Sequence, residues 1–199
     1  MMLRYVNLTV TGEDAQFTLG QLMYAVHGYN AERAEDDRIA VSFPTMQDAV
    51  VSERGKVLSK GTFGTQLRLF ATGEKLSEFL VSAVPNKLAR MGAIVRGTVS
   101  EVPAGAGAVR FVRDRKFEKT IREGAYARRQ QGRAVEHGRE YFARKKLEKP
   151  VSVGLLIRSK SSDCSFHIDV RREASLVPVG VSQVSAYGLC GEGSAVPLF

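Results

Sequence analysis

Few side chains in this sequence titrate near neutral pH and are suited to acid–base or nucleophilic chemistry. They are His27, His137, His167, Cys164 and Cys190. No two of them have the spacing of metal ligands, and no group of acidic residues is arranged to hold Mg²⁺. The sequence therefore predicts a protein without a metal or a cofactor, in which any catalysis uses a histidine as the general base.

The net charge of the chain is confined to residues 110–149. This segment holds 14 of the 29 Lys and Arg residues but only 6 of the 21 Asp and Glu residues. Its surplus equals the net charge of +8 of the whole chain, so the remainder is neutral. A charge this concentrated indicates a surface for a polyanion, and nucleic acid is the simplest candidate.

A helix is predicted over about 117–134, inside this basic segment. At 100° per residue, one face of that helix carries four cations around a tyrosine, all within about 80° of one another. These residues are Lys119, Arg122, Tyr126, Arg129 and Arg133. The face suits a row of phosphates. The alternative is a solvated face with ion pairs to Glu118 and Glu123.

RNA can be cleaved without a metal when the ribose 2′-OH attacks the adjacent phosphorus and leaves a 2′,3′-cyclic phosphate and a 5′-OH. The protein must remove the 2′ proton and hold the nucleophile in line. His27, on a predicted apolar helix, is the candidate base, although a lone histidine in such a place is also compatible with a structural role. His137 is the fallback base.

The bulk composition is that of a globular protein. The chain has 199 residues, 44% of them hydrophobic, which is enough for one large domain or two small ones. No run approaches the roughly 18 apolar residues of a membrane span, and the first residues lack the pattern of a signal peptide. We therefore expect a cytoplasmic protein with free thiols at Cys164 and Cys190.

The first half of the chain predicts a ferredoxin-like βαββαβ domain over residues 1–101. The periodicity favours strands and helices in alternation, with glycine-rich loops or a hairpin over 53–65. The strands are expected over 2–10, 37–43, 66–71 and 92–101, and the helices over 16–31 and 73–82.

A second domain is predicted over residues 109–199, after a flexible linker at 102–108. It would begin with a short strand or loop over 109–115 and continue with the basic helix and a helix over about 138–147. β-structure follows from 151 to the end. The predicted fold class is therefore α+β, with an arginine-rich helix in the C-terminal domain.

Three segments together resemble the type I-F CRISPR RNA-processing endoribonucleases. They are AVHGYN with DRIAVSFP (25–30 and 37–44), IRSKSSDCSFHIDV (157–170) and AYGLCGEGSAVPLF (186–199). The resemblance implies a metal-independent enzyme that cleaves the repeat hairpin of precursor CRISPR RNA at the base of the stem. It also implies that the protein stays bound to the mature crRNA with the other subunits of a surveillance complex.

The resemblance also assigns residues. Those implied in catalysis are His27, Ser159 and Tyr187. Those implied in RNA binding are Arg113 and Arg115, which read bases, Phe166, which stacks on a base, and the groove-binding Arg122, Arg128, Arg129 and Arg133. The sequence departs from the family at Arg115, where glutamine is usual, and His27 aligns only with a gap of one residue. Arginine favours guanine and glutamine favours adenine, so the base at this step is expected to differ.

Two alternatives from other functional classes stay open. The first is a non-catalytic hairpin RNA-binding subunit of a ribonucleoprotein complex, which would keep the fold and the basic helix without cutting. The second is a basic scaffold protein that has no preference for hairpins.

Overall fold

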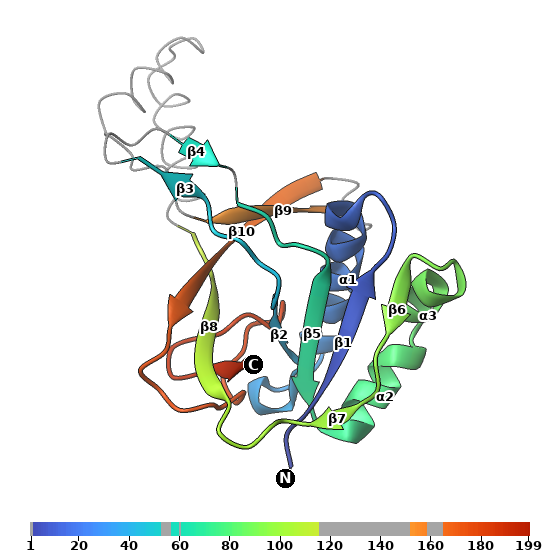
Figure 1. The fold of residues 1–199 in the computed structure, drawn as a ribbon. Coiled ribbons are helices and arrows are strands. Elements are labelled where there is room, and N and C mark those ends of the chain that lie inside the picture. The colour runs from blue at the N-terminus through green and yellow to red at the C-terminus, as the bar shows by residue number, and fades with distance from the viewer. Residues whose placement is uncertain (1, 53–56, 60, 116–151, 159–164) are drawn as a thin grey trace, which may run out of the picture.

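The computed structural model describes residues 2–52, 57–59, 61–115, 152–158 and 165–199. Within these residues the chain is an α+β protein with two larger antiparallel sheets and three α-helices (Figure 1). The predicted α+β class is therefore confirmed. The helices predicted over about 117–134 and 138–147 lie outside the described residues.

The first sheet has the strand order β2-β5-β1-β6. Its strands are β1 (Arg4–Val10), β2 (Ala40–Ser42), β5 (Gln66–Ala71), β6 (Ile94–Arg96) and the short β7 (Ser100–Glu101), which pairs with β1. In β1 the side chains of Val6, Leu8 and Val10 are buried and those between them are partly exposed. This alternation is expected of a strand with one face on the core. It confirms the predicted strand over 2–10.

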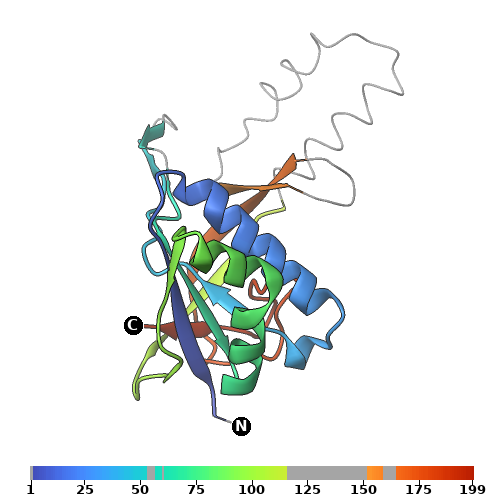
Figure 2. The ribbon, with the colours of Figure 1, turned by 90° about the vertical axis from the view of Figure 1, so that its right-hand side faces the viewer.

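Helices cover one face of this sheet (Figure 2). The first, α1 (Ala15–Ala31), begins where the Asp14 carboxylate accepts a hydrogen bond of 2.9 Å from Phe17 N. The second, α2 (Gly73–Val81), follows the cap residue Thr72. Both confirm the predicted helices. No helix in the described part of the chain is long and apolar enough to cross a membrane.

The sequence predictions fail at two places between α2 and the end of the first sheet. A third helix, α3 (Ala83–Arg90), is missing from the predictions. Its Pro85 lies in the first helical turn. The N–H groups of that turn have no partner within the helix, so proline can stand there without loss of a helical hydrogen bond. The single strand predicted over 92–101 is wrong in extent, because it divides into β6 and β7 around Gly97, whose N–H donates to Asn7 O at 2.8 Å.

The second sheet has the strand order β11-β8-β10-β9. Its strands are β8 (Gly107–Arg113), β9 (Val153–Arg158), β10 (Ser165–Ala174) and β11 (Val196–Leu198). β8 begins at Gly107, so the last two residues of the linker predicted over 102–108 belong to a strand. Separately, β3 (Val50–Val51) and β4 (Val57–Ser59) form a short hairpin. The division into two domains stays a prediction.

Helix α1 connects the two sheets. It packs on β1 and also lies against β9, the edge strand of the second sheet. At Gly20 the two backbones lie so close that an added Cβ atom would overlap Leu156 O. Only glycine lets the backbones of helix and strand come this near, so Gly20 determines how closely α1 approaches the second sheet.

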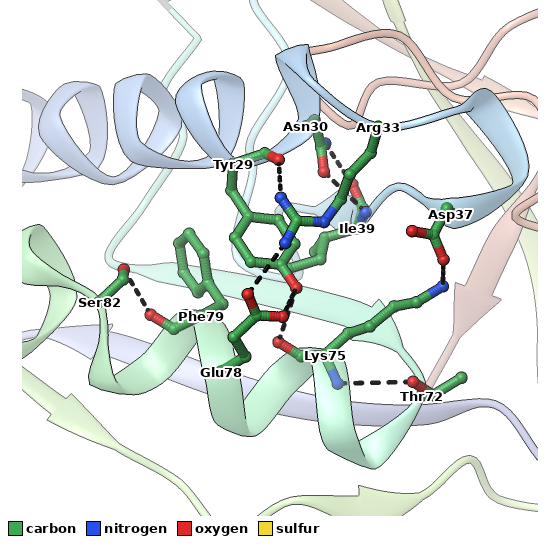
Figure 3. Close-up of polar contacts among 10 residues, drawn as sticks. All are labelled: Tyr29, Asn30, Arg33, Asp37, Ile39, Thr72, Lys75, Glu78, Phe79 and Ser82. Carbon is green, nitrogen blue, oxygen red and sulfur yellow. Dashed lines mark hydrogen bonds and ion pairs between the residues drawn. The ribbon is translucent and has the colours of Figure 1, made fainter.

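Polar contacts hold the last turns of α1 on its surroundings (Figure 3). The buried Asn30 amide donates to Ile39 O and accepts from Ile39 N, both at 2.9 Å, so it pairs with the backbone that leads into β2. Tyr29 Oη donates to the Glu78 carboxylate of α2 at 2.6 Å. Arg33 Nη2 donates to the same carboxylate at 2.9 Å. These bonds fix the end of α1 relative to α2 and β2.

We expect Gly20→Ala to lower the free energy of unfolding by about 1–3 kcal/mol, because the added methyl group overlaps the Leu156 carbonyl. Gly28→Ala is the matched control on the same helix, since a Cβ at Gly28 meets no atom within 4 Å. It should raise stability by up to about 1 kcal/mol through helix propensity. Urea denaturation of both variants measures the difference. Equal stability of the two would contradict the close packing of α1 on β9.

Candidate active site

The imidazole of His27 stacks on the phenol ring of Tyr187. The ring centroids are 4.3 Å apart and the ring planes differ by 10°. His27 belongs to α1, whereas Tyr187 belongs to the segment 183–191 that precedes β11. The fold therefore brings together two of the three residues predicted for catalysis from opposite ends of the sequence.

Backbone pairing on both sides places Tyr187. The N–H of Val41 in β2 donates to Gly188 O at 2.9 Å, and Cys190 N–H donates to Phe111 O in β8 at 2.8 Å. The segment 183–191 thus lies between an edge of the first sheet and a strand of the second. Gly188 has φ 72°, and a Cβ there would lie 2.6 Å from Ile39 O. The turn after Tyr187 therefore requires glycine.

Arg38 and Asn30 support this arrangement, and the sequence analysis missed both. The Arg38 guanidinium donates to Val184 O at 2.9 Å and to the carbonyls of Asn30 and Arg33 at the end of α1. Arg38 therefore ties the helix that carries His27 to the segment that carries Tyr187. The sequence did contain a signal for Asn30, because a polar residue within the apolar pattern of a predicted helix indicates a buried hydrogen bond.

Arg113 also lies near the Tyr187 ring. It is the last residue of β8, and its guanidinium carbon is 5.7 Å from the ring centroid. Val109 and Phe111, on the same face of the strand, are buried. The stacked rings of His27 and Tyr187 and the nearby cation of Arg113 therefore form one group, which we call the His27 column.

The surroundings of His27 disfavour its charged form. Its Nδ1 atom is buried and has no hydrogen-bond partner among the described residues. Burial is the main cause that lowers the pKa of His27 below the ordinary value of 6.5, and the positive charge of Arg113 lowers it further. Both effects favour the neutral imidazole, which is the form able to accept a proton.

The other described RNA-binding candidates occupy different positions. Arg115 is exposed, two residues beyond Arg113. The intervening Asp114 is buried, with its N–H donating to Asp169 O at 2.7 Å. Phe166 is partly buried and packs against the core, on the same side of β10 as Ile168. None of the contacts that define the His27 column includes Arg115 or Phe166.

The remaining candidates lie outside the described residues. They are Ser159, Lys119, Arg122, Arg128, Arg129 and Arg133, together with His137 and Cys164. Arg158, the neighbour of Ser159, ends β9 at a cavity of about 900 Å³ that Tyr24 also lines. Tyr24 lies one turn before His27 on α1. The end of β9 and this turn of α1 therefore line the same cavity.

No group of three or more His, Cys, Asp or Glu residues that could hold a metal ion occurs in the described part of the chain. The three members of the His27 column include no carboxylate, and Cys190 is a buried free thiol. What the arrangement provides is a neutral imidazole held against a phenol ring, with a cation nearby. These groups suit proton transfer beside an anionic substrate.

Two comparisons with known proteins bear on this site. The family model described as "CRISPR-associated protein (Cas_Csy4)" matches residues 5–199. A search of curated proteins finds no match. The family match extends over the whole of α1, β8 and the segment 183–191, so it includes every element that contributes to the His27 column.

We expect Gly188→Ala to displace Tyr187 from His27. In NMR spectra the stacked phenol ring shields the imidazole protons of His27, and the variant should remove that shielding. Gly105→Ala is the control, because Gly105 also has a positive φ (76°) but a Cβ there meets no atom within 4 Å. The Gly105→Ala variant therefore has the backbone strain of about 1–2 kcal/mol without a steric overlap, and it should leave the His27 signals unchanged. Unchanged His27 signals in Gly188→Ala would show that Gly188 does not hold Tyr187 in place.

Proposed function

Because the chain belongs to the CRISPR-associated Cas_Csy4 family, the type I-F crRNA-processing endoribonucleases, we propose that it cleaves the repeat hairpin of precursor CRISPR RNA with His27 as the general base. The single observation that carries this assignment is the His27 column. In this group a histidine of helix α1 lies near Arg113, which ends the strand that leads into the basic segment.

The proposed reaction needs no metal. His27 takes the proton of the ribose 2′-OH, and the 2′ oxygen attacks the adjacent phosphorus. The bond from phosphorus to the 5′ oxygen breaks, and that oxygen takes a proton from water and leaves as a 5′-OH. His27 then gives its proton back to the solvent. The other product ends in a 2′,3′-cyclic phosphate. Because Nδ1 of His27 is buried, the nitrogen that accepts the proton is Nε2.

Tyr187 and Ser159 have proposed positioning roles in this reaction. The Tyr187 ring lies parallel to the imidazole and restricts its rotation, so Nε2 keeps one direction. Ser159 would donate a hydrogen bond to the ribose and hold the 2′-OH in line with the phosphorus. In support of this role, β9 ends one residue before Ser159, at the cavity that Tyr24 of α1 lines.

RNA binding is assigned to the basic segment and to the residues that lead into it. Arg113 and Arg115 would read bases at the foot of the stem, because a forked guanidinium fits guanine O6 and N7. Phe166 would stack on a base beside the scissile bond. The arginines over 117–134 would contact phosphates, which dominate the affinity of proteins for paired RNA. Tight binding of the product would retain the protein on the mature crRNA, as a subunit of the surveillance complex.

We also propose that the first sheet and its helices form a ferredoxin-like domain. The strand order β2-β5-β1-β6 supports this proposal, because β1 and β5 are the central pair and every pairing is antiparallel. Such a domain is shared by proteins of many functions, so it contributes a scaffold for α1 rather than evidence of activity.

His27→Ala should abolish cleavage of a repeat-hairpin RNA in EDTA while leaving binding of that RNA unchanged. The reason is that the variant removes the base but none of the proposed phosphate contacts. His167→Ala is the matched control, because His167 is exposed on β10, on the side opposite the core. It should cut at the wild-type rate.

Cleavage by His27→Ala at the full rate would contradict the assignment of the base, and His137→Ala would then be the variant to compare. Tight binding without any cleavage by the wild-type protein would instead favour a non-catalytic RNA-binding subunit. Equal competition by an unrelated duplex RNA would favour a scaffold without a hairpin preference.

A further inference from the structure

We propose that Arg113, beyond reading a base, is a positioning residue for catalysis that keeps His27 uncharged and ready to accept a proton. The catalytic consequence rests on the proposed function, whereas the electrostatic effect is a property of the protein without RNA. The two parts can therefore be tested separately.

The geometry of the His27 column is the first argument. The Arg113 guanidinium lies 5.7 Å from the Tyr187 ring centroid, and that ring lies 4.3 Å from the imidazole. Both groups lie against the same ring, so the fixed charge of Arg113 acts on His27 at short range. All three residues are partly buried, and screening by solvent is weaker there than between fully exposed groups.

The elements packed around His27 offer little competing charge. No charged residue lies within one turn of His27 on α1, on β2 or in residues 181–191. On the strands of the second sheet, Asp114 and Glu173 form ion pairs with Arg171. Arg158 ends β9 and adds a further positive charge, and Asp169 lies on the side of β10 opposite the core. Arg38 is held by the carbonyls of Asn30, Arg33 and Val184. Among the described residues, Arg113 is the cation that acts on the imidazole.

The buried Nδ1 atom of His27 makes the imidazole sensitive to this charge. With Nε2 as the proton acceptor, Nδ1 carries the ring N–H in both the neutral and the charged form. Because Nδ1 is buried, water does not reach this side of the ring, so a charged imidazolium is poorly solvated and the neutral ring is already preferred. Both burial and Arg113 lower the pKa of His27, and removing Arg113 removes the second of these two causes.

This arrangement links recognition of RNA to catalysis. Guanine is neutral, so an Arg113 that donates to guanine O6 and N7 keeps its full charge near His27. A phosphate in the same place would neutralise the guanidinium and leave burial alone to lower the pKa of His27. Correct base recognition therefore preserves the reactive form of the base, which adds to whatever binding energy the contact provides.

The direct test is an NMR titration of the histidines in the full chain without RNA, with His27 assigned by comparison with His27→Ala. We expect Arg113→Gln to move the His27 titration to higher pH and Arg113→Lys, which keeps the charge, to leave it close to wild type. Arg113→Met is a second neutral variant in case the first does not fold. The exposed His167 is the internal reference, and its titration should be the same in every variant. Arg115→Gln is the matched control outside the column, and it should leave the His27 titration unchanged.

An unchanged His27 titration in Arg113→Gln would overturn the proposal, and so would equal shifts in Arg113→Gln and Arg113→Lys. The catalytic consequence is then measured as the pH dependence of single-turnover cleavage at saturating protein. Its acid limb should move to higher pH in Arg113→Gln but not in Arg113→Lys. A shifted NMR titration without any cleavage by wild type would refute the proposed function and leave the electrostatic effect standing.

Discussion

The site depends on one constraint, which is that the segment 183–191 must fit between β2 of the first sheet and β8 of the second. Its backbone bonds to Val41 on one side and to Phe111 on the other, and the left-handed turn at Gly188 leaves no room for a side chain beside Ile39. Tyr187 immediately precedes this turn. The direction of its ring is therefore set by backbone geometry, which is more rigid than a side-chain contact at the surface.

The same constraint explains why α1 is held so firmly. Gly20 allows α1 to approach β9, and Asn30 and Arg38 fix its other end to β2 and to Val184. His27 lies between these two attachments. A helix anchored at one end only could rotate or slide, and the two rings would lose their parallel contact. The surplus charge is in residues 110–149, whereas His27 and Tyr187 come from the neutral remainder. Arg113, near the start of the charged segment, lies beside Tyr187 and so joins the two parts.

Much of this fold could be predicted from the sequence, because local patterns carry the information. The alternation of β1 and the apolar spacing of α1 and α2 depend on neighbours within a few residues. The α3 helix was missed because it has only eight residues, contains Pro85 and follows α2 directly, and because α1, α2 and β6, on which it packs, surround it only in the folded chain. Asn30 and Arg38 were missed for a related reason. Their partners, Ile39 and Val184, are backbone groups that become neighbours only in the folded chain. The pairing of His27 with Tyr187 rested on resemblance to a family, since spacing alone could not bring together residues so far apart in sequence.

The central claim is that the His27 column promotes attack by a ribose 2′-OH without a metal. The most direct measurement is cleavage, in EDTA, of a repeat-hairpin RNA that carries a single 2′-deoxy nucleotide at the scissile position. The account predicts that the protein binds this RNA as tightly as the all-ribose form and does not cut it, while the ribose form gives a 2′,3′-cyclic phosphate. Cleavage of the deoxy substrate, or a product with a 3′-OH end, would contradict the account.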